Sequence, residues 1–233
     1  MFGVFVSGTD TGVGKTTISC ALLVALRARG LRASGMKPIA SGCETEPCGL
    51  RNADALALIE ASDPAPCYAD CNPYAFGEAI APHLAARNEN VEISLPRVRD
   101  AYSTIARATD CMVVEGVGGW AVPLSGAAMQ VDLVRVLDLP VILVVGLRLG
   151  CLNHALLSAR AIDADGCRLI GWVGNRVDPS MARVEENIAT LRERLPAPCL
   201  GIVPHLDTPD PVRAATDLDA ACAAVCATHR PWT

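Results

Sequence analysis

Long apolar runs and a basic leader segment are both missing from this 233-residue chain. No apolar run approaches the roughly 18 residues that a membrane-spanning helix needs, and no basic segment followed by an apolar one opens the sequence. We therefore expect a soluble, cytoplasmic protein with no membrane partner.

Clusters of basic residues are also missing. Lysine and arginine number 20 against 25 aspartates and glutamates, which gives a net charge of −5 and a pI near 5.4. Neutralising the phosphates of a nucleic acid needs clustered cations. The composition therefore argues against a nucleic-acid partner.

Paired metal-binding cysteines are the third absence. Eleven cysteines are present, but the close spacings Cys43 to Cys48, Cys67 to Cys71 and Cys222 to Cys226 are not the CxxC or Cys/His pattern of a zinc site. We expect these cysteines to be reduced thiols that pack as small, half-apolar side chains.

The chain does contain a large apolar fraction. Hydrophobic residues make up 51% and charged residues 19% of the sequence, and the mean hydropathy is +0.32. This composition excludes a disordered chain. The length and the unbroken pattern of elements predict a single domain over residues 1–233.

Short apolar runs alternate with helical stretches along the chain. Apolar runs without polar alternation are typical of strands covered on both faces, and the helical stretches repeat apolar residues with a 3.6-residue period. The sequence therefore predicts an α/β fold with a mainly parallel sheet and helices on both faces. The expected strands are 2–7, 33–37, 111–115, 140–146, 169–174 and 199–203, and the expected helices are 16–29, 52–61, 95–105 capped by Ser94, 130–137, 152–164, 181–195 and 217–228. The loop-rich stretch 40–92 reads as an insertion or lid.

The strongest motif is a glycine-rich loop, GTDTGVGKTT, at residues 8–17, between the first strand and the first helix. In a phosphate loop, backbone N–H groups surround the phosphates, a lysine reaches the β and γ oxygens, and a hydroxyl binds Mg²⁺. Gly12 and Gly14 permit the tight wrap, while Lys15 and Thr16 supply the charge and the ligand. Five residues separate Gly8 from Gly14, one more than in GxxxxGK[ST]. The dinucleotide fingerprint GxGxxG does not fit, so the motif predicts a P-loop NTPase-type fold that binds ATP and Mg²⁺.

Two acidic residues are candidates for the magnesium site. Glu115 ends an apolar strand and enters a glycine-rich segment, where a Walker-B acid would reach the ion directly or through water. Asp54 is the other candidate, although an aspartate in the first turn of a helix is more often simply solvated.

A second cation, Lys37, follows the second expected strand and precedes Ser41 and Gly42 in KPIASG. A lysine at a strand end is usually solvated. Two lysines facing one γ-phosphoryl group would suit transfer to an anionic acceptor, because the charges of donor and acceptor must be neutralised.

Seven further motifs accompany this loop in order. The chain resembles the dethiobiotin synthetase family over nearly its whole length, in GTDTGVGKT (8–16), KPIASG (37–42), RNADA (51–55), NPYAF (72–76), EGVGGW (115–120) and PVILVVGLRLGCLNH (140–154), and further in GWVGNRV (171–177) and GIVPHL (201–206). The resemblance implies conversion of 7,8-diaminononanoate, CO₂ and ATP into dethiobiotin, ADP and phosphate, through a carbamate and a carbamic-phosphoric anhydride.

The resemblance also implies roles for individual residues. Lys15 and Lys37 would stabilise the transferring phosphoryl group and the carbamate, Thr11 and Ser41 would lie close to substrate, and Thr16, Asp54 and Glu115 would hold Mg²⁺. The implied nucleotide-binding residues are Gly12, Val13, Gly14, Lys15, Thr16, Thr17, Glu115, Gly116, Val117, Gly118, Asn175, Arg176, Pro204, His205 and Leu206.

A homodimer is implied as well. Gly150, Cys151, Leu152 and Asn153 open an expected helix whose N–H groups could bind the substrate carboxylate of the neighbouring subunit. An ordinary helix start is a serious alternative reading of this segment.

Three other functions fit the sequence less well. A deviant phosphate-loop ATPase, which acts as a switch, carries a signature lysine in KGGxGK[ST], but the aligned residue here is Asp10. A nucleotide-binding regulator without catalysis is disfavoured because Lys15, Lys37, Asp54 and Glu115 are all present. An amidotransferase-type ligase would need a glutaminase domain or partner, for which this chain has no room.

Overall fold

A six-stranded sheet forms the centre of the protein, and all of its paired strands run parallel. The computed structural model describes residues 2–228. The strand order is β10-β9-β8-β1-β7-β2. The strands are β1 (Phe2–Gly8), β2 (Ala33–Met36), β7 (Cys111–Glu115), β8 (Val141–Gly146), β9 (Leu169–Asn175) and β10 (Cys199–Val203).

The inner strands are buried on both faces. β7 and β8 consist of buried residues throughout, as their unbroken apolar sequences CMVVE and VILVVG predict for strands of a covered parallel sheet. Side chains that alternate along a strand enter two separate apolar cores: in β1, Phe5 belongs to one core, while Val4 and Val6 belong to the other.

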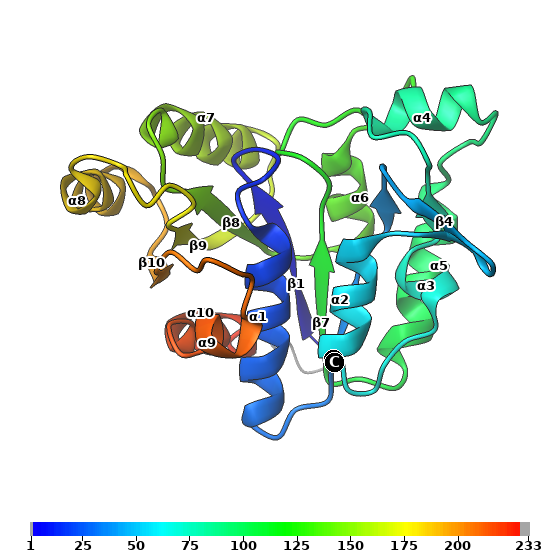
Figure 1. Cartoon of the computed structure of the whole chain (residues 1–233), viewed down its shortest axis with the longest axis horizontal. Coiled ribbons are helices and arrows are strands. Elements are labelled where there is room, and N and C mark those ends of the chain that lie inside the picture. The colour runs from blue at the N-terminus through cyan, green and yellow to red at the C-terminus, as the bar shows by residue number, and fades with distance from the viewer. Residues whose placement is uncertain (1, 229–233) are drawn as a thin grey trace.

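Helices cover the two faces as separate layers. α1 (Lys15–Ala28), α2 (Ala53–Ala61), α9 (Pro211–Ala215) and α10 (Asp219–Cys226) contribute to one core, and α4 (Pro82–Asn88), α5 (Leu95–Ala106), α6 (Gln130–Leu137), α7 (Cys151–Ala164) and α8 (Val184–Arg194) contribute to the other. Figure 1 shows α1 crossing the near face of the sheet, with α9 and α10 beside it. Within residues 2–228, no helix has both the length and the apolar character that crossing a bilayer requires.

The expected sheet strands and helices are confirmed to within a few residues. Ser94 caps α5 as expected, because its hydroxyl accepts a hydrogen bond from the Arg97 backbone N–H at 3.4 Å. The expected helix 181–195 begins later, at Val184, since Arg183 adopts a left-handed conformation with φ +55°. The expected helix 217–228 is shorter, and α9 was not expected.

The stretch 40–92 is more structured than its loop-rich sequence indicated. It contains most of a two-stranded parallel sheet of β3 (Ile39–Ala40) and β6 (Tyr74–Ala75), an antiparallel pair of β4 (Glu44–Glu46) and β5 (Gly49–Arg51), and the helices α2, α3 (Tyr68–Cys71) and α4. Strands of two or three residues are too short to show an alternating pattern, so the sequence did not reveal them.

The topology places a crevice at the carboxyl end of β1. The chain leaves β1 for β2 on one side and later crosses to β8 on the other, so the connections diverge beside β1. Ligands of open α/β sheets bind at such a switch point. The loop between β1 and α1 lies at this edge (Figure 1).

Candidate functional site

The glycine-rich loop has the geometry of a phosphate cradle. Gly12 and Gly14 have φ values of +73° and +86°, in the left-handed region that favours glycine. At Gly14 a Cβ atom would lie 2.1 Å from the Asn175 side-chain nitrogen, so this position has no room for another residue. No side chain among residues 2–228 caps α1 at Gly14, and its first N–H groups remain available to an anion.

Lys37 lies at the centre of a buried cluster of charges. Its ammonium group donates to Glu115 Oε1 at 2.5 Å, to Asp54 Oδ2 at 2.9 Å and to the Gly116 carbonyl at 3.2 Å. Lys37 is only 3% exposed and Glu115 only 1%, whereas the Asp54 side chain is 41% exposed. Lys37 is therefore the internal counter-ion of both carboxylates and not a solvated residue at a strand end.

Glu115 also contacts the phosphate loop. The Thr16 hydroxyl donates to Glu115 Oε1 at 3.0 Å, which joins α1 to the end of β7. Within residues 2–228, Glu115 Oε2 is buried and has no hydrogen-bond partner. A buried carboxylate oxygen without a partner is costly unless a ligand satisfies it. The oxygen donors of Glu115, Thr16 and Asp54 therefore fit a hard divalent cation such as Mg²⁺.

The charges of this cluster shift the pKa values of its members. Burial, followed by the like charge of Lys37, lowers the pKa of Lys15 to about 8. Burial acts in the same direction on Lys37, but the carboxylates of Glu115 and Asp54 outweigh it and raise the pKa of Lys37. Desolvation opposes ionisation of Asp54, yet the Lys37 ammonium group lowers the pKa of that carboxyl.

These residues open into one cleft of about 840 Å³. Thr11, Ser41 and Lys37 line it from three different segments, and the Ser41 hydroxyl is buried without a hydrogen-bond partner among residues 2–228. Further lining residues belong to the sequence-based site: Gly12, Gly14, Lys15, Thr16, Thr17, Asp54, Glu115, Val117 and Gly118. Other lining residues had been given no role from the sequence: Asn52, Ala79 to Pro82, Gly119 and Ala121 to Pro123. Val13 instead lies beneath the loop, buried against Gly146.

Two side chains that support the site, Gln130 and Asn72, had been given no role from the sequence. Gln130, at the start of α6, accepts from the Val117 N–H at 2.8 Å and donates to the Gly119 carbonyl at 2.6 Å, and so shapes the loop after Glu115. Asn72 donates to the Lys37 carbonyl at 2.6 Å. Asn72 belongs to the NPYAF motif noted above, whereas Gln130 has no sequence signal because its partners are backbone atoms of a distant loop.

The residues expected to contact the nucleotide base lie at the same edge of the sheet but do not line this cleft. Asn175 ends β9 and donates to the Val13 carbonyl at 3.0 Å. The Arg176 carbonyl lies 2.9 Å from His205 Nδ1, which connects the ends of β9 and β10 next to Pro204. Leu206 packs against the α1 side of the protein.

The segment expected to serve a neighbouring subunit lies outside the cleft of its own chain. Gly150, with φ +94°, precedes the first turn of α7. Cys151 is buried, Leu152 is half-buried and Asn153 is exposed. None of these residues lines the cleft, so one chain alone does not bring them to the phosphate loop.

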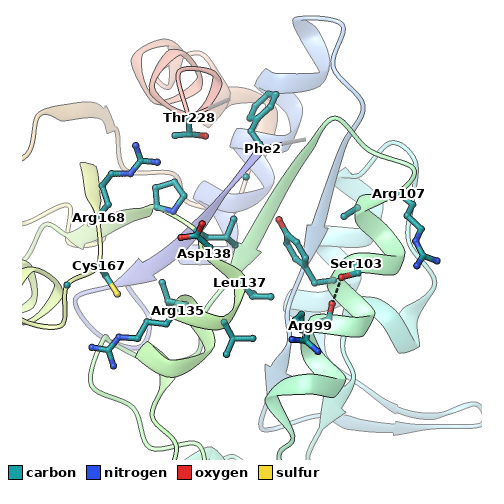
Figure 2. Close-up of a pocket in the computed structure, with 18 residues that line it drawn as sticks. Phe2, Arg99, Ser103, Arg107, Arg135, Leu137, Asp138, Cys167, Arg168 and Thr228 are labelled. Carbon is teal, nitrogen blue, oxygen red and sulfur yellow. Dashed lines mark hydrogen bonds between the residues drawn. The ribbon is translucent and has the colours of Figure 1, made fainter. Parts of the chain in front are cut away.

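A second cavity, of about 890 Å³, lies at the opposite edge of the sheet. Figure 2 shows its lining, which includes Phe2, Arg99, Asp138 and Arg168. These residues flank the amino ends of β1, β8 and β9 or belong to α5. No residue of the sequence-based site lies there, so size alone does not identify the functional site.

The fold and the cleft define a P-loop nucleotide-binding protein of the α/β class. Similarity to solved structures supports the fold: MinD from Aquifex aeolicus is 15% identical, with a TM-score of 0.61 and full coverage of both chains. The signal recognition particle receptor FtsY from Elizabethkingia anophelis is 15% identical, with a TM-score of 0.52 over 97% of this chain and 65% of that one. Such low identity shows the fold alone.

Sequence relatives narrow the class. A family described as AAA domain matches residues 3–213. The ATP-dependent dethiobiotin synthetase BioD of Xanthomonas euvesicatoria pv. vesicatoria (strain 85-10) is 58% identical over 86% of this chain and 89% of its own length. The protein of the same name from Pseudomonas paraeruginosa (strain DSM 24068 / PA7) is 57% identical over 92% and 95%. The chain therefore belongs to the ATP-dependent dethiobiotin synthetase family, whose members are ligases of biotin biosynthesis.

Proposed function

We propose that this chain closes the ureido ring of dethiobiotin from 7,8-diaminononanoate, CO₂ and ATP. One amine and CO₂ form a carbamate with loss of a proton. A carbamate oxygen then attacks the γ-phosphorus, ADP leaves, and a carbamic-phosphoric anhydride forms. The second amine attacks the carbamoyl carbon, and phosphate leaves as the ring closes. The observation that carries this proposal is the meeting of Lys15, Lys37, Thr16, Asp54 and Glu115 in one cleft.

The two lysines supply the positive charge that this sequence of steps needs. Carbamate and γ-phosphate are both anions, so their approach costs electrostatic energy unless cations neutralise them. Lys15 lies in the phosphate loop, and its ammonium group donates to the Asp10 carbonyl at 3.0 Å. Lys37 also lines the cleft and is held there by Glu115 and Asp54.

Thr16, Asp54 and Glu115 are the residues that would hold Mg²⁺. When bound, the ion would neutralise oxygens of the β- and γ-phosphates. No group of three or more His, Cys, Asp or Glu side chains within residues 2–228 forms a complete metal site, so phosphate oxygens and water would complete the coordination. The chain itself supplies the orientation, because Thr16 and Lys37 both donate to Glu115 Oε1 and so leave Oε2 without a protein partner.

The remaining expectations are part of the same proposal. Thr11 and Ser41 would contact substrate, and the segments around Asn175 and Pro204 to Leu206 would hold the base of the nucleotide, with residues 40–92 as a lid within one domain. Gly150 to Asn153 would reach the substrate carboxylate of the partner in a homodimer. We propose a cytoplasmic location, a reducing compartment that would keep the eleven cysteines as thiols.

The test is a coupled assay of phosphate release, combined with mass-spectrometric detection of dethiobiotin. We expect ATP consumption that requires the diamine, CO₂ or bicarbonate, and Mg²⁺ together, with one phosphate released for each dethiobiotin formed. Omission of any one component should stop the reaction. ATP hydrolysis that continues without the diamine would contradict this function and favour a nucleotide switch.

A further inference from the structure

The phosphate loop contains one acidic residue, Asp10. Its side chain and backbone make three contacts: Oδ1 accepts from the Thr11 N–H at 2.7 Å, the carbonyl accepts from the Lys15 ammonium group at 3.0 Å, and Oδ2 accepts from Arg148 at 2.5 Å. Asp10 therefore orders the loop, but its carboxylate also puts a negative charge close to Lys15, the lysine expected to bind the phosphates.

Arg148 comes from a different part of the fold. It lies between the end of β8 and the start of α7, and its side chain contacts the β1–α1 loop at Asp10. Its backbone is fixed independently of its side chain: the Leu147 N–H donates to the Asn175 carbonyl at 2.7 Å, and the Arg148 carbonyl accepts from the Cys151 N–H at 3.0 Å. The guanidinium group thus reaches Asp10 from a backbone segment that is held by its own hydrogen bonds.

The pair contributes little to folding stability. The side chains of Arg148 and Asp10 are 39% and 46% exposed, and ion pairs at such exposure are screened by water and typically contribute less than about 1 kcal/mol. The electrostatics of the phosphate loop offers a stronger reason for the contact, because an unneutralised carboxylate so close to Lys15 would weaken the attraction of the loop for an incoming phosphate.

We propose that Arg148 is a positioning residue for the nucleotide: it neutralises Asp10, so that the carboxylate can order the phosphate loop without repelling ATP. This inference rests on the proposed nucleotide site at residues 12–17. In the KGGxGK[ST] loops discussed above, the position of Asp10 is occupied by a lysine. Here an acid takes that position, and the compensating cation comes from the end of a neighbouring strand.

The test is calorimetric titration of the full chain with ADP and with the non-hydrolysable analogue adenylyl imidodiphosphate. Arg148→Ala leaves Asp10 uncompensated, so we expect the affinity for the analogue to fall about tenfold, the size of one charge contact that water partly screens. ADP, which lacks the γ-phosphate charge, should lose less. The melting temperature should not change, and Arg148→Lys should keep most of the affinity because it keeps the charge.

A double variant separates neutralisation from packing. Asp10→Asn removes the charge but keeps an oxygen that can accept from the Thr11 N–H. The double variant Asp10→Asn/Arg148→Ala should therefore recover to within about threefold of the unsubstituted protein, a coupling that only interacting residues show. Arg32→Ala is the matched control, since Arg32 forms an exposed ion pair with Asp110 at the opposite edge of the sheet.

Two results would overturn the inference. The first is an Arg148→Ala variant that binds both nucleotides as tightly as the unsubstituted protein, and the second is a double variant that shows no recovery. Failure of the unsubstituted chain to bind either nucleotide would instead contradict the proposed function, so the two failures are distinguishable.

Discussion

At the scale of single residues, the site depends on a balance of buried charges. Lys37 and Glu115 are almost fully buried, and an ion removed from water is stable only when a partner compensates for its lost hydration. Lys37 provides this compensation for Glu115 and, at the mouth of the cleft, for Asp54. The same lysine is proposed to contact the carbamate, so binding of substrates must redistribute its contacts.

This balance gives a prediction for Lys37→Ala. Turnover should fall by about 10² to 10³, the usual effect of losing one transition-state contact to a charge. Stability should fall as well, by about 3 kcal/mol, because the Glu115 carboxylate loses its counter-ion in a buried position. Single-turnover kinetics and urea denaturation measure the two effects.

Lys37→Arg is the control for this variant. It keeps the positive charge, so the loss of stability should be small, while the longer planar group should still reduce turnover. Addition of Mg²⁺ and ATP should recover part of the stability of Lys37→Ala, because the ion can take over the two carboxylates. Normal turnover in Lys37→Ala would remove this lysine from the mechanism.

At the scale of elements, the short helix α2 carries a site residue, and the cap of this helix sets the position of that residue. α2 carries Asp54 in its first turn, and Asn52 caps it by accepting from the Ala55 N–H at 3.2 Å. The Asn52 backbone N–H donates in turn to the Tyr68 hydroxyl at 2.7 Å. The side chain and the backbone of Asn52 therefore both fix the start of α2, from which Asp54 reaches Lys37.

Two cap variants should separate folding from function. Asn52→Ala and Ser94→Ala each remove the N-cap side chain of a helix and should each cost about 1 kcal/mol of stability in urea denaturation. Only Asn52→Ala should also lower the rate of the ATP-dependent reaction, because α2 carries Asp54 whereas α5 lies outside the cleft. Equal rates in the two variants would show that the cap does not position Asp54.

At the scale of the whole molecule, the double layer of helices decides which side chains solvent can reach. Cys48 and Cys67 are exposed, whereas Cys20, Cys71, Cys111 and Cys222 are buried. Burial, the largest cause in each case, raises the pKa of Cys20 and Cys71 to about 12 and that of Cys222 to about 11. Buried thiols therefore remain protonated and unreactive at neutral pH.

This distribution predicts the thiol reactivity of the native protein. Ellman's reagent should label Cys48 and Cys67 in a fast phase, because these two cysteines are exposed. All eleven thiols should react after unfolding. Cys48→Ser combined with Cys67→Ser should abolish the fast phase, and a fast phase that persists would show that other thiols, such as the partly exposed Cys167, Cys199 and Cys226, react as readily.

The local pattern of the chain determined its elements and the chemistry of its loop. Unbroken apolar runs specify buried parallel strands, and a glycine-rich loop between a strand and a helix specifies a phosphate site, because both signals depend on neighbouring residues. The sequence also supplied Asp54 and Glu115 as candidates for the magnesium site. It supplied Lys37 as a separate candidate, a second cation for phosphoryl transfer.

Only the tertiary structure decided how these residues meet. Segments far apart in the chain become neighbours through the strand order β10-β9-β8-β1-β7-β2. The same is true of three sets of side-chain contacts: those of Lys37 with both acids, the Gln130 hydrogen bonds to the loop after Glu115, and the Asp10–Arg148 pair. The physical reason is that a side-chain contact depends on how β-strands are ordered and helices packed. Packing is a property of the whole core, whereas periodicity and loop composition are properties of a few consecutive residues.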